Sequence, residues 1–189
     1  MCGILFYLKK NKKNLNIHEK KLLIKSSKLL QHRGPDFSKY IIDKNKFIFH
    51  SRLSIQDPSK KSNQPMIKRV NNRKHTFIFN GEIYNFKKLR SEMMSKNKIK
   101  TKGDSEILFL SYLNNENKSD LMKKLKGMFS FLVIRDDDEI FFARDRYGQK
   151  PLYFLENDKI IVFSSEIKPL LKILGKCELN DDEINKYIL

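Results

Sequence analysis

The sequence contains few cysteines, glycines and prolines and no tryptophan: 2 Cys, 7 Gly and 5 Pro in 189 residues. Two cysteines, Cys2 and Cys177, cannot build a disulfide framework, which excludes a disulfide-stapled secreted domain. No apolar run is long enough to cross a bilayer, and lysines follow the apolar run at Ile4 instead of preceding it, unlike a secretory signal. We therefore expect a cytoplasmic protein with no membrane partner.

Acidic residues are also scarce, 22 against 39 basic ones, which gives a formal net charge of +17. A clustered basic face would indicate nucleic-acid binding, but the lysines are spread along the chain and mixed with asparagine, as in residues 9–14 and 71–74. No zinc-ligand spacing, helix-turn-helix pattern or aromatic ribonucleoprotein motif accompanies them. The charge therefore predicts a solvated surface and no nucleic-acid partner.

The composition is that of a folded domain: 40% hydrophobic, 32% charged, with 14 Phe and 7 Tyr. Alternation and turn residues predict strands at residues 2–8, 40–43, 47–53, 76–80, 128–135, 139–144, 151–156 and 159–164. Helical spacing predicts helices at residues 18–30, 85–96, 104–113 and 119–125 and from residue 166 to about 175. Short strands joined by polar turns favour antiparallel pairing, so we expect an α+β domain of two stacked sheets covered by helices.

Three local features complete this expectation. Asn85 and Asp104 are predicted to cap the helices that they begin, and Asn80-Gly81 is predicted to form a tight turn ahead of the first of them. Residues 56–74, with few periodic apolar positions, are predicted to form an exposed loop. We expect residues 1–175 to form one domain and residues 176–189 to begin a linker.

Cysteine stands directly after the initiator methionine, followed by Gly3 and an apolar run. Removal of Met1 would place a thiol and a free α-amine on Cys2, and the amine, with an ordinary pKa of roughly 8, could accept the thiol proton. Such a residue is both nucleophile and base. The alternative is a cysteine that merely begins a buried strand.

Short motifs accompany Cys2 at residues 32–36 (HRGPD), 52–55 (RLSI), 80–85 (NGEIYN), 103–106 (GDSE) and 143–153 (ARDRYGQKPLY). This series closely resembles the glutamine-hydrolysing domain of asparagine synthetase, a class II glutamine amidotransferase of the N-terminal-nucleophile hydrolase superfamily. The motifs follow the family's order over nearly the whole chain, which chance explains poorly. The resemblance implies a four-layer αββα sandwich with Cys2 at the start of a central strand.

Glutamine presents an α-carboxylate and an α-ammonium that a glutaminase must hold. Arg52 suits the carboxylate because guanidinium makes bidentate bonds to it, and Asp104 suits the ammonium. Without the flanking motifs, Arg52 would indicate only a strand-surface arginine and Asp104 only a helix N-cap. The glutamine-binding set implied by the resemblance is Arg52, Leu53, Ser54, Ile55, Gln56, Asn80, Gly81, Glu82 and Asp104.

Attack by a thiolate puts negative charge on the amide oxygen, which then needs hydrogen-bond donors. The side-chain NH₂ of Asn80 and the backbone N–H of Gly81 can supply them, and the resemblance implies this oxyanion hole. Cys2, Asn80 and Gly81 are therefore the expected catalytic residues. The four histidines, His18, His32, His50 and His75, have neither metal-binding spacing nor a recognisable acid partner, so we expect no metal site and no histidine base.

The family's synthetase domain uses ATP and magnesium to activate aspartate, and its nucleotide loop has the form Ser-Gly-Gly-x-Asp-Ser. No such segment occurs here, so we expect no cofactor in this chain. The expected partners are L-glutamine and an ammonia-accepting synthetase domain in cis or trans, with a homodimer as a further candidate. The alternatives are a glutaminase that serves another amide- or amino-forming synthetase and a degenerate module that binds glutamine without turnover.

Overall fold

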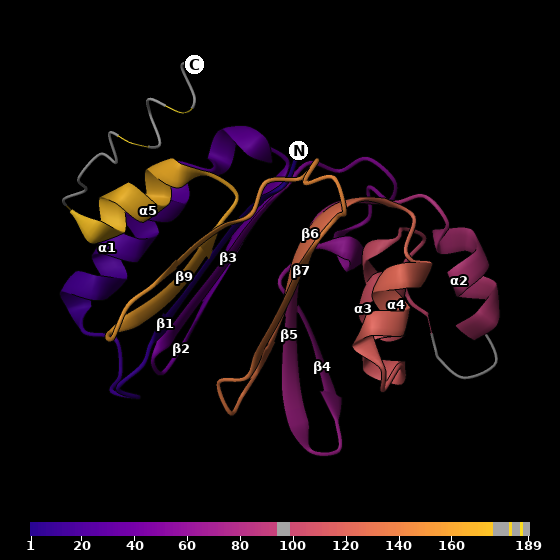
Figure 1. Cartoon of the computed structure of the whole chain (residues 1–189), viewed down its shortest axis with the longest axis horizontal. Coiled ribbons are helices and arrows are strands. Elements are labelled where there is room, and N and C mark those ends of the chain that lie inside the picture. Colours follow the sequence, from indigo (N-terminus) through magenta and orange to yellow (C-terminus); the bar gives the residue numbers. More distant parts are fainter. Residues whose placement is uncertain (94–98, 176–181, 183–185, 187–189) are drawn as a thin grey trace.

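The computed structural model describes residues 1–93, 99–175, 182 and 186. Two sheets are stacked face to face, with helices on both outer faces (Figure 1). The first sheet has the strand order β2-β3-β1-β9-β8, with β1 (Gly3–Lys9), β2 (Phe37–Asp43), β3 (Lys46–Arg52), β8 (Tyr153–Glu156) and β9 (Ile160–Ser164). The second has the order β4-β5-β6-β7, with β4 (Met66–Val70), β5 (Arg73–Ile83), β6 (Gly127–Arg135) and β7 (Ile140–Arg144).

Every strand pair in the described chain is antiparallel. Two helices, α1 (Ile17–Lys28) and α5 (Ile167–Leu174), cover the first sheet, as Figure 1 shows. On the second sheet lie α2 (Phe86–Met93), α3 (Ser105–Asn114) and α4 (Lys118–Lys124). The predicted α+β four-layer αββα sandwich is confirmed.

Alternation along β1 shows why the layers form. Ile4, Phe6 and Leu8 face the other sheet, where they pack in a cluster with Ile78 and Leu132 among others. The intervening residues of β1 pack toward the helices instead. Because both faces are covered, β1 is buried over nearly its whole length, and the residue that precedes it, Cys2, is held at a fixed place.

Several predicted boundaries were wrong for physical reasons. The Asn80-Gly81 turn is absent, because β5 continues through both residues to Ile83 in register with β6. The expected exposed loop at residues 56–74 contains β4 and a 3₁₀ turn (Lys60–Ser62).

The capping residues also differ from those expected. Asn85 does not cap α2: its side chain accepts from Lys126 N–H at 3.0 Å and donates to the Lys124 carbonyl at 2.9 Å. Asn16, not His18, begins the first helix, through a capping box with Glu19. The last residues of the predicted helix 85–96, the predicted linker 176–189 apart from residues 182 and 186, and Cys177 lie outside the described residues.

Candidate active site

One pocket opens at the end of the sandwich where the N-terminus lies (Figure 1) and has a volume of about 120 Å³. Its lining includes Cys2 and, from the predicted glutamine-binding set, Arg52, Leu53, Ile55, Gln56, Asn80, Gly81, Glu82 and Asp104. Ser54 does not line it, and its backbone N–H donates to Asp36 at 2.6 Å. The fold thus gathers Cys2 and residues from four of the five other sequence motifs, including all but one of the predicted set, around one cavity.

Cys2 lies half-buried just ahead of β1, and its thiol sulfur is 3.8 Å from the Leu53 carbonyl oxygen. Burial raises the pKa of the thiol, and the positive charges of the N-terminal amine and Arg52 oppose that rise. Met1 also lines the pocket, so its removal would enlarge the cavity and leave the amine on Cys2. The thiol therefore needs a nearby base to ionise, as the amine of Cys2 would provide.

Arg33 anchors the N-terminus and was assigned no role from the sequence. Its Nε donates to the Cys2 carbonyl at 2.9 Å, and its Nη1 donates to Glu166 at 3.1 Å, while the residue is 9% exposed. His32 Nε2 meets the same Glu166 oxygen at 2.9 Å. The HRGPD motif therefore holds the backbone of Cys2 in place. The position of this motif in the series was the sequence signal that could have identified Arg33.

Gly81 adopts a backbone conformation that favours glycine, with φ of +152°, and a Cβ there would lie 2.2 Å from the Met128 carbonyl oxygen. Its register partner, Phe129, uses both its N–H and its C=O on Asp145. Two residues before and after Gly81, backbone N–H groups donate away from β6, to Gln64 and Asp104. By the period of the strand, Gly81 N–H points the same way, toward the pocket.

Asn80 is 1% exposed, and its Nδ2 has no hydrogen-bond partner within the described chain. A buried amide donor without a partner is costly, because it gives up hydrogen bonds to water and gains none in exchange. Here it lines the same cavity as the Cys2 thiol. Asn80 and Gly81 thus offer two donors beside a nucleophile, the arrangement that stabilises an oxyanion.

Arg52 ends β3 and is 6% exposed. Its Nη1 donates to the Ser59 carbonyl at 2.9 Å and to Asn63 Oδ1 at 2.7 Å, and its Nη2 donates to the Asp57 carbonyl. No partner for Nε is found among the residues described, and Nη2 retains a second hydrogen. The guanidinium is therefore oriented by the loop and keeps donors for an incoming carboxylate.

The loop that orients Arg52 was predicted to be exposed, and this prediction was wrong near its beginning, at Asp57. Asp57 is 6% exposed; its carboxylate accepts from Ser62 Oγ at 2.7 Å, Lys102 N–H at 2.7 Å and Ser59 N–H at 2.9 Å. Although burial opposes ionisation, these bonds hold the pKa of Asp57 well below its usual range. The loop is thereby tied to residues 101–104 and forms one wall of the pocket.

Asp104 is 5% exposed, and its Oδ2 accepts from Ile83 N–H at 2.8 Å. Burial, assisted by the charge of Glu82, raises its pKa to about 6 against the opposing hydrogen bonds. It stands at the N-cap position of α3 but makes no side-chain capping bond, so the capping interpretation was wrong. A cationic ligand would therefore stabilise the ionised form of this buried carboxylate.

Further polar groups at or near the cavity include one predicted residue, Gln56, and two that the sequence interpretation did not assign, Thr101 and Lys150. Gln56 lines the pocket, and Thr101 does not; Gln56 Oε1 and Thr101 Oγ1 are both buried without partners in the part of the chain that is described. Lys150 is 7% exposed and lines the pocket. Lys150 lies in the matched motif at residues 143–153, which could have pointed to it, whereas nothing local marked Thr101.

The histidines do not line this pocket. His50 is fully buried, its Nε2 lies 2.9 Å from the Phe79 carbonyl, and burial lowers its pKa to about 4, so its ring is neutral near pH 7. Over the described residues, no group of three or more His, Cys, Asp or Glu side chains is placed to hold a metal ion. Over the same residues, no helix has the length and apolar character needed to span a membrane.

Comparison with known proteins identifies the family. The family described as "Glutamine amidotransferase domain" matches residues 1–189. Asparagine synthetase [glutamine-hydrolyzing] 1 of Bacillus subtilis is 32% identical over 190 residues, which cover 100% of this chain and 29% of the relative. Asparagine synthetase B of Escherichia coli is 33% identical over 157 residues, 82% of this chain and 27% of the relative. The chain thus spans less than a third of these relatives and belongs to the class II glutamine amidotransferase domain family.

Two solved structures have a fold similar to that of this chain. The glutamine phosphoribosylpyrophosphate amidotransferase of B. subtilis matches with a TM-score of 0.75 at 19% identity, over 94% of this chain and 44% of that one. A structure described as the allosteric regulatory enzyme of purine biosynthesis matches with a TM-score of 0.76 at 19% identity, over 95% and 44%. At this identity the likeness concerns the fold.

Proposed function

We propose that this chain hydrolyses glutamine to glutamate and ammonia, and that it serves as the glutaminase part of a glutamine-dependent asparagine synthetase. The observation that carries the proposal is one pocket that gathers a thiol, an unpaired buried amide donor, a guanidinium and a carboxylate. Each of these four groups would interact with one part of glutamine. The relatives named above support asparagine synthesis as the use of the ammonia.

Binding would use the two charged groups on the α-carbon of glutamine. The free donors of Arg52 suit the α-carboxylate, and the Asp104 carboxylate suits the α-ammonium. Leu53, Ile55, Gln56 and Glu82 would complete the walls around them. The side-chain amide then reaches toward Cys2.

Chemistry would begin when the α-amine of the processed Cys2 takes the proton of the thiol. The thiolate forms a bond to the amide carbon, and the resulting oxyanion accepts hydrogen bonds from Asn80 Nδ2 and Gly81 N–H. Collapse breaks the carbon–nitrogen bond, while the protonated amine returns its proton to the leaving ammonia. Water then hydrolyses the γ-glutamyl thioester and releases glutamate.

The test is glutamate release from glutamine by the chain freed of Met1, without ATP. We expect turnover in that protein and nearly none when Met1 or an N-terminal tag is retained, because neither leaves a free amine on Cys2. Glutamine binding without glutamate release, measured by calorimetry on the same sample, would instead establish the degenerate binding module.

The use of the ammonia is tested by adding ATP, magnesium and aspartate. The chain alone is expected to form glutamate and ammonia but no asparagine, because it contains no Ser-Gly-Gly-x-Asp-Ser loop. Adding a synthetase domain, joined or separate, should yield asparagine and pyrophosphate. Asparagine from the isolated chain would overturn this assignment, and amidation of another carboxylate would change the product while keeping the glutaminase.

A further inference from the structure

A second pocket, which we call the basic pocket, lies on the outer side of β6 and has a volume of about 660 Å³. Its lining is Ser119, Met122, Lys123, Leu125, Lys126, Gly127, Phe129, Ala143, Arg144, Arg146 and Tyr147. Four of these side chains are cationic and none is acidic. Cationic side chains around an apolar surface favour a ligand that carries carboxylates together with some apolar surface.

The cations of the basic pocket differ in what already holds them. Arg144 donates to the carbonyls of Lys150 and Gly148 and so braces its own loop. Lys126 and Arg146 have exposed side chains and no ion pair within the described part of the chain. Beside them the ring of Tyr147 is 81% exposed. These groups are free to meet a partner.

The basic pocket and the pocket of the candidate active site, which we call the glutamine pocket after its proposed substrate, are separated by one shared wall. Along β6, Gly127 and Phe129 line the basic pocket, and Met128 between them lines the glutamine pocket. The loop after β7 does the same, with Tyr147 on one side and Lys150 on the other. A partner seated in the basic pocket would therefore stand one strand away from the place where ammonia is released.

A single buried carboxylate joins the two halves of that wall. Asp145 accepts from the backbone N–H groups of Phe129, Tyr147, Gln149 and Lys150, at 2.9 to 3.2 Å. These bonds hold its pKa below the usual range despite its burial. These hydrogen bonds therefore fix the shape of the wall before a partner docks.

We propose that the basic pocket seats an acidic segment of the domain that accepts the ammonia. This inference rests on the proposed function, since only a glutaminase needs an acceptor beside its pocket. The relative from B. subtilis has most of its length outside the matched region, 29% of it being covered, so such a chain carries a further large part. The lining, with four cations and no anion, fits an acidic surface on that part.

The experiment measures binding of a fluorescein-labelled decaglutamate peptide to the Met1-free chain by anisotropy, at an ionic strength of about 0.05 M, where screening is weak. The pocket variant carries Lys126→Gln and Arg146→Gln. Its matched control carries Lys21→Gln and Lys25→Gln, exposed lysines of α1 on the opposite outer face of the sandwich (Figure 1), and has the same net charge. We expect the dissociation constant to rise about fivefold to tenfold in the pocket variant and less than about twofold in the control.

Equal weakening in both variants, or no binding at all, would overturn the proposal, because net charge alone would then govern the contact. A single-stranded RNA decamer that binds more tightly than the peptide and loses its affinity in the pocket variant would also overturn it, in favour of nucleic acid. Glutamate release is measured on the same samples. Absent turnover together with pocket-selective peptide binding would refute the proposed function and leave the docking surface supported.

Discussion

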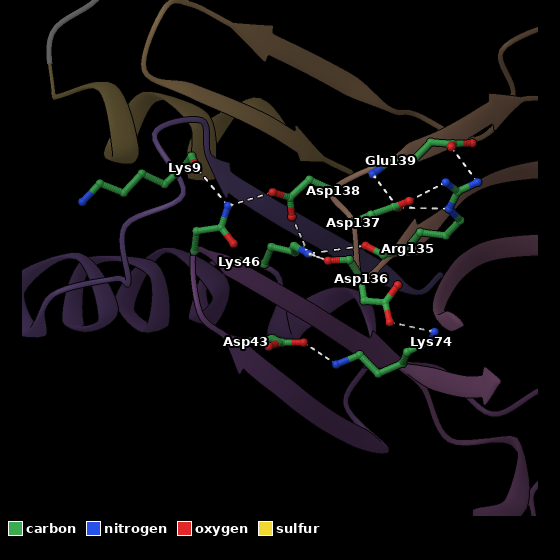
Figure 2. Close-up of polar contacts among 10 residues, drawn as sticks. Lys9, Asp43, Lys46, Lys74, Arg135, Asp136, Asp137, Asp138 and Glu139 are labelled. Atoms are coloured by element: carbon green, nitrogen blue, oxygen red, sulfur yellow. Dashed lines mark hydrogen bonds and ion pairs between the residues drawn. The ribbon is translucent and has the colours of Figure 1, made fainter. Parts of the chain in front are cut away.

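The two ends of the sheet sandwich are built from the same strands but differ in whether a buried asparagine at each end is paired. Strands β1, β3, β5 and β6 each run from the glutamine pocket to a cluster of ionic contacts at the far end, which we call the ionic end (Figure 2). There the buried Lys46 pairs with Asp138 at 2.5 Å and donates to two backbone carbonyls, and Lys74 pairs with Asp43.

Two asparagines make the contrast concrete. Asn45, 3% exposed at the ionic end, donates to the Lys9 carbonyl at 2.9 Å and to Asp138 at 3.3 Å. Asn80, 1% exposed at the pocket, has no partner for its Nδ2 in the described chain. Satisfied buried polar groups hold a fold together, whereas an unsatisfied donor that also lines a cavity, as Asn80 does, is available to a bound molecule.

Replacing Cys2 by Ala should have the largest effect on activity. Removal of the nucleophile is expected to lower the rate of glutamate release by more than about 10³-fold. The melting temperature should change little, because the hydrogen bond that the thiol makes within the described residues, to the Leu53 carbonyl, is long at 3.8 Å. Steady-state kinetics and thermal unfolding check both halves, and near-normal turnover would refute the mechanism.

The two asparagines should separate activity from stability. Asn80→Ala is expected to lower kcat roughly 10²- to 10³-fold with little loss of stability, since it deletes a donor that the fold does not use. Asn45→Ala should keep kcat and lower the free energy of unfolding by about 1–3 kcal/mol, since it removes two hydrogen bonds, to the Lys9 carbonyl and to Asp138. Kinetics and chemical denaturation measure the pair. Comparable stability losses with equal kcat would erase the contrast.

A change at Arg52 should affect both activity and stability, because Arg52 lines the pocket and also holds the loop that forms one of its walls. Arg52→Ala is expected to raise KM for glutamine about 10- to 100-fold through the lost carboxylate contact, and also to lower the melting temperature because the Asp57 and Ser59 carbonyls lose their donor. Arg52→Lys should restore part of the affinity with its charge but not the bidentate geometry. A falling melting temperature with unchanged KM would leave Arg52 as a loop anchor only.

The pH dependence of binding should give the smallest effect. Asp104 has a pKa of about 6 in the free pocket, so KM should rise up to about tenfold per pH unit below 6 as the carboxylate is protonated. In Asp104→Asn, KM should be high throughout and this pH dependence should vanish. A wild-type slope retained in the variant would assign the titration to another group.

The same shift affects stability in a defined direction. Because the folded-state pKa of Asp104 is raised, its contribution to stability is present below about pH 4 and is lost as the pH rises through about 6. Asp104→Asn should therefore melt at or above the wild-type temperature at pH 8, as thermal unfolding can show. A clear drop there would mean that the ionised carboxylate is needed by the fold.

The sequence predicted the layers and most of the pocket because both depend on local patterns and on short motifs. Alternation in β1 and the positions of Cys2, Arg52 and Asp104 were all visible in this way. Asn80-Gly81 misled because the pair is a strong turn signal, whereas pairing with β6 carries the strand through it and only glycine fits there. Long-range contacts decide such cases.

The polar walls were harder to foresee. Asp57 is fixed by bonds to Ser62 and to the distant Lys102, and Arg33 reaches Cys2 across 31 residues, so no periodicity announces either. Nor does a sequence distinguish a paired asparagine from an unpaired one. The motif at residues 80–85 singled out Asn80 as a donor, but only the fold shows that its Nδ2 is unpaired and that Asn45 is paired.

The central claim is that the unpaired groups at the pocket act on glutamine while the paired groups at the ionic end only hold the sheets. Rapid acid quenching of the Met1-free chain with glutamine, followed by peptide mass spectrometry, tests it most directly by following the γ-glutamyl group. The account predicts a thioester on Cys2 that forms at the wild-type rate in Asn45→Ala and at least about 10²-fold more slowly in Asn80→Ala. An acyl group on another residue, or equal rates in the two variants, would contradict it.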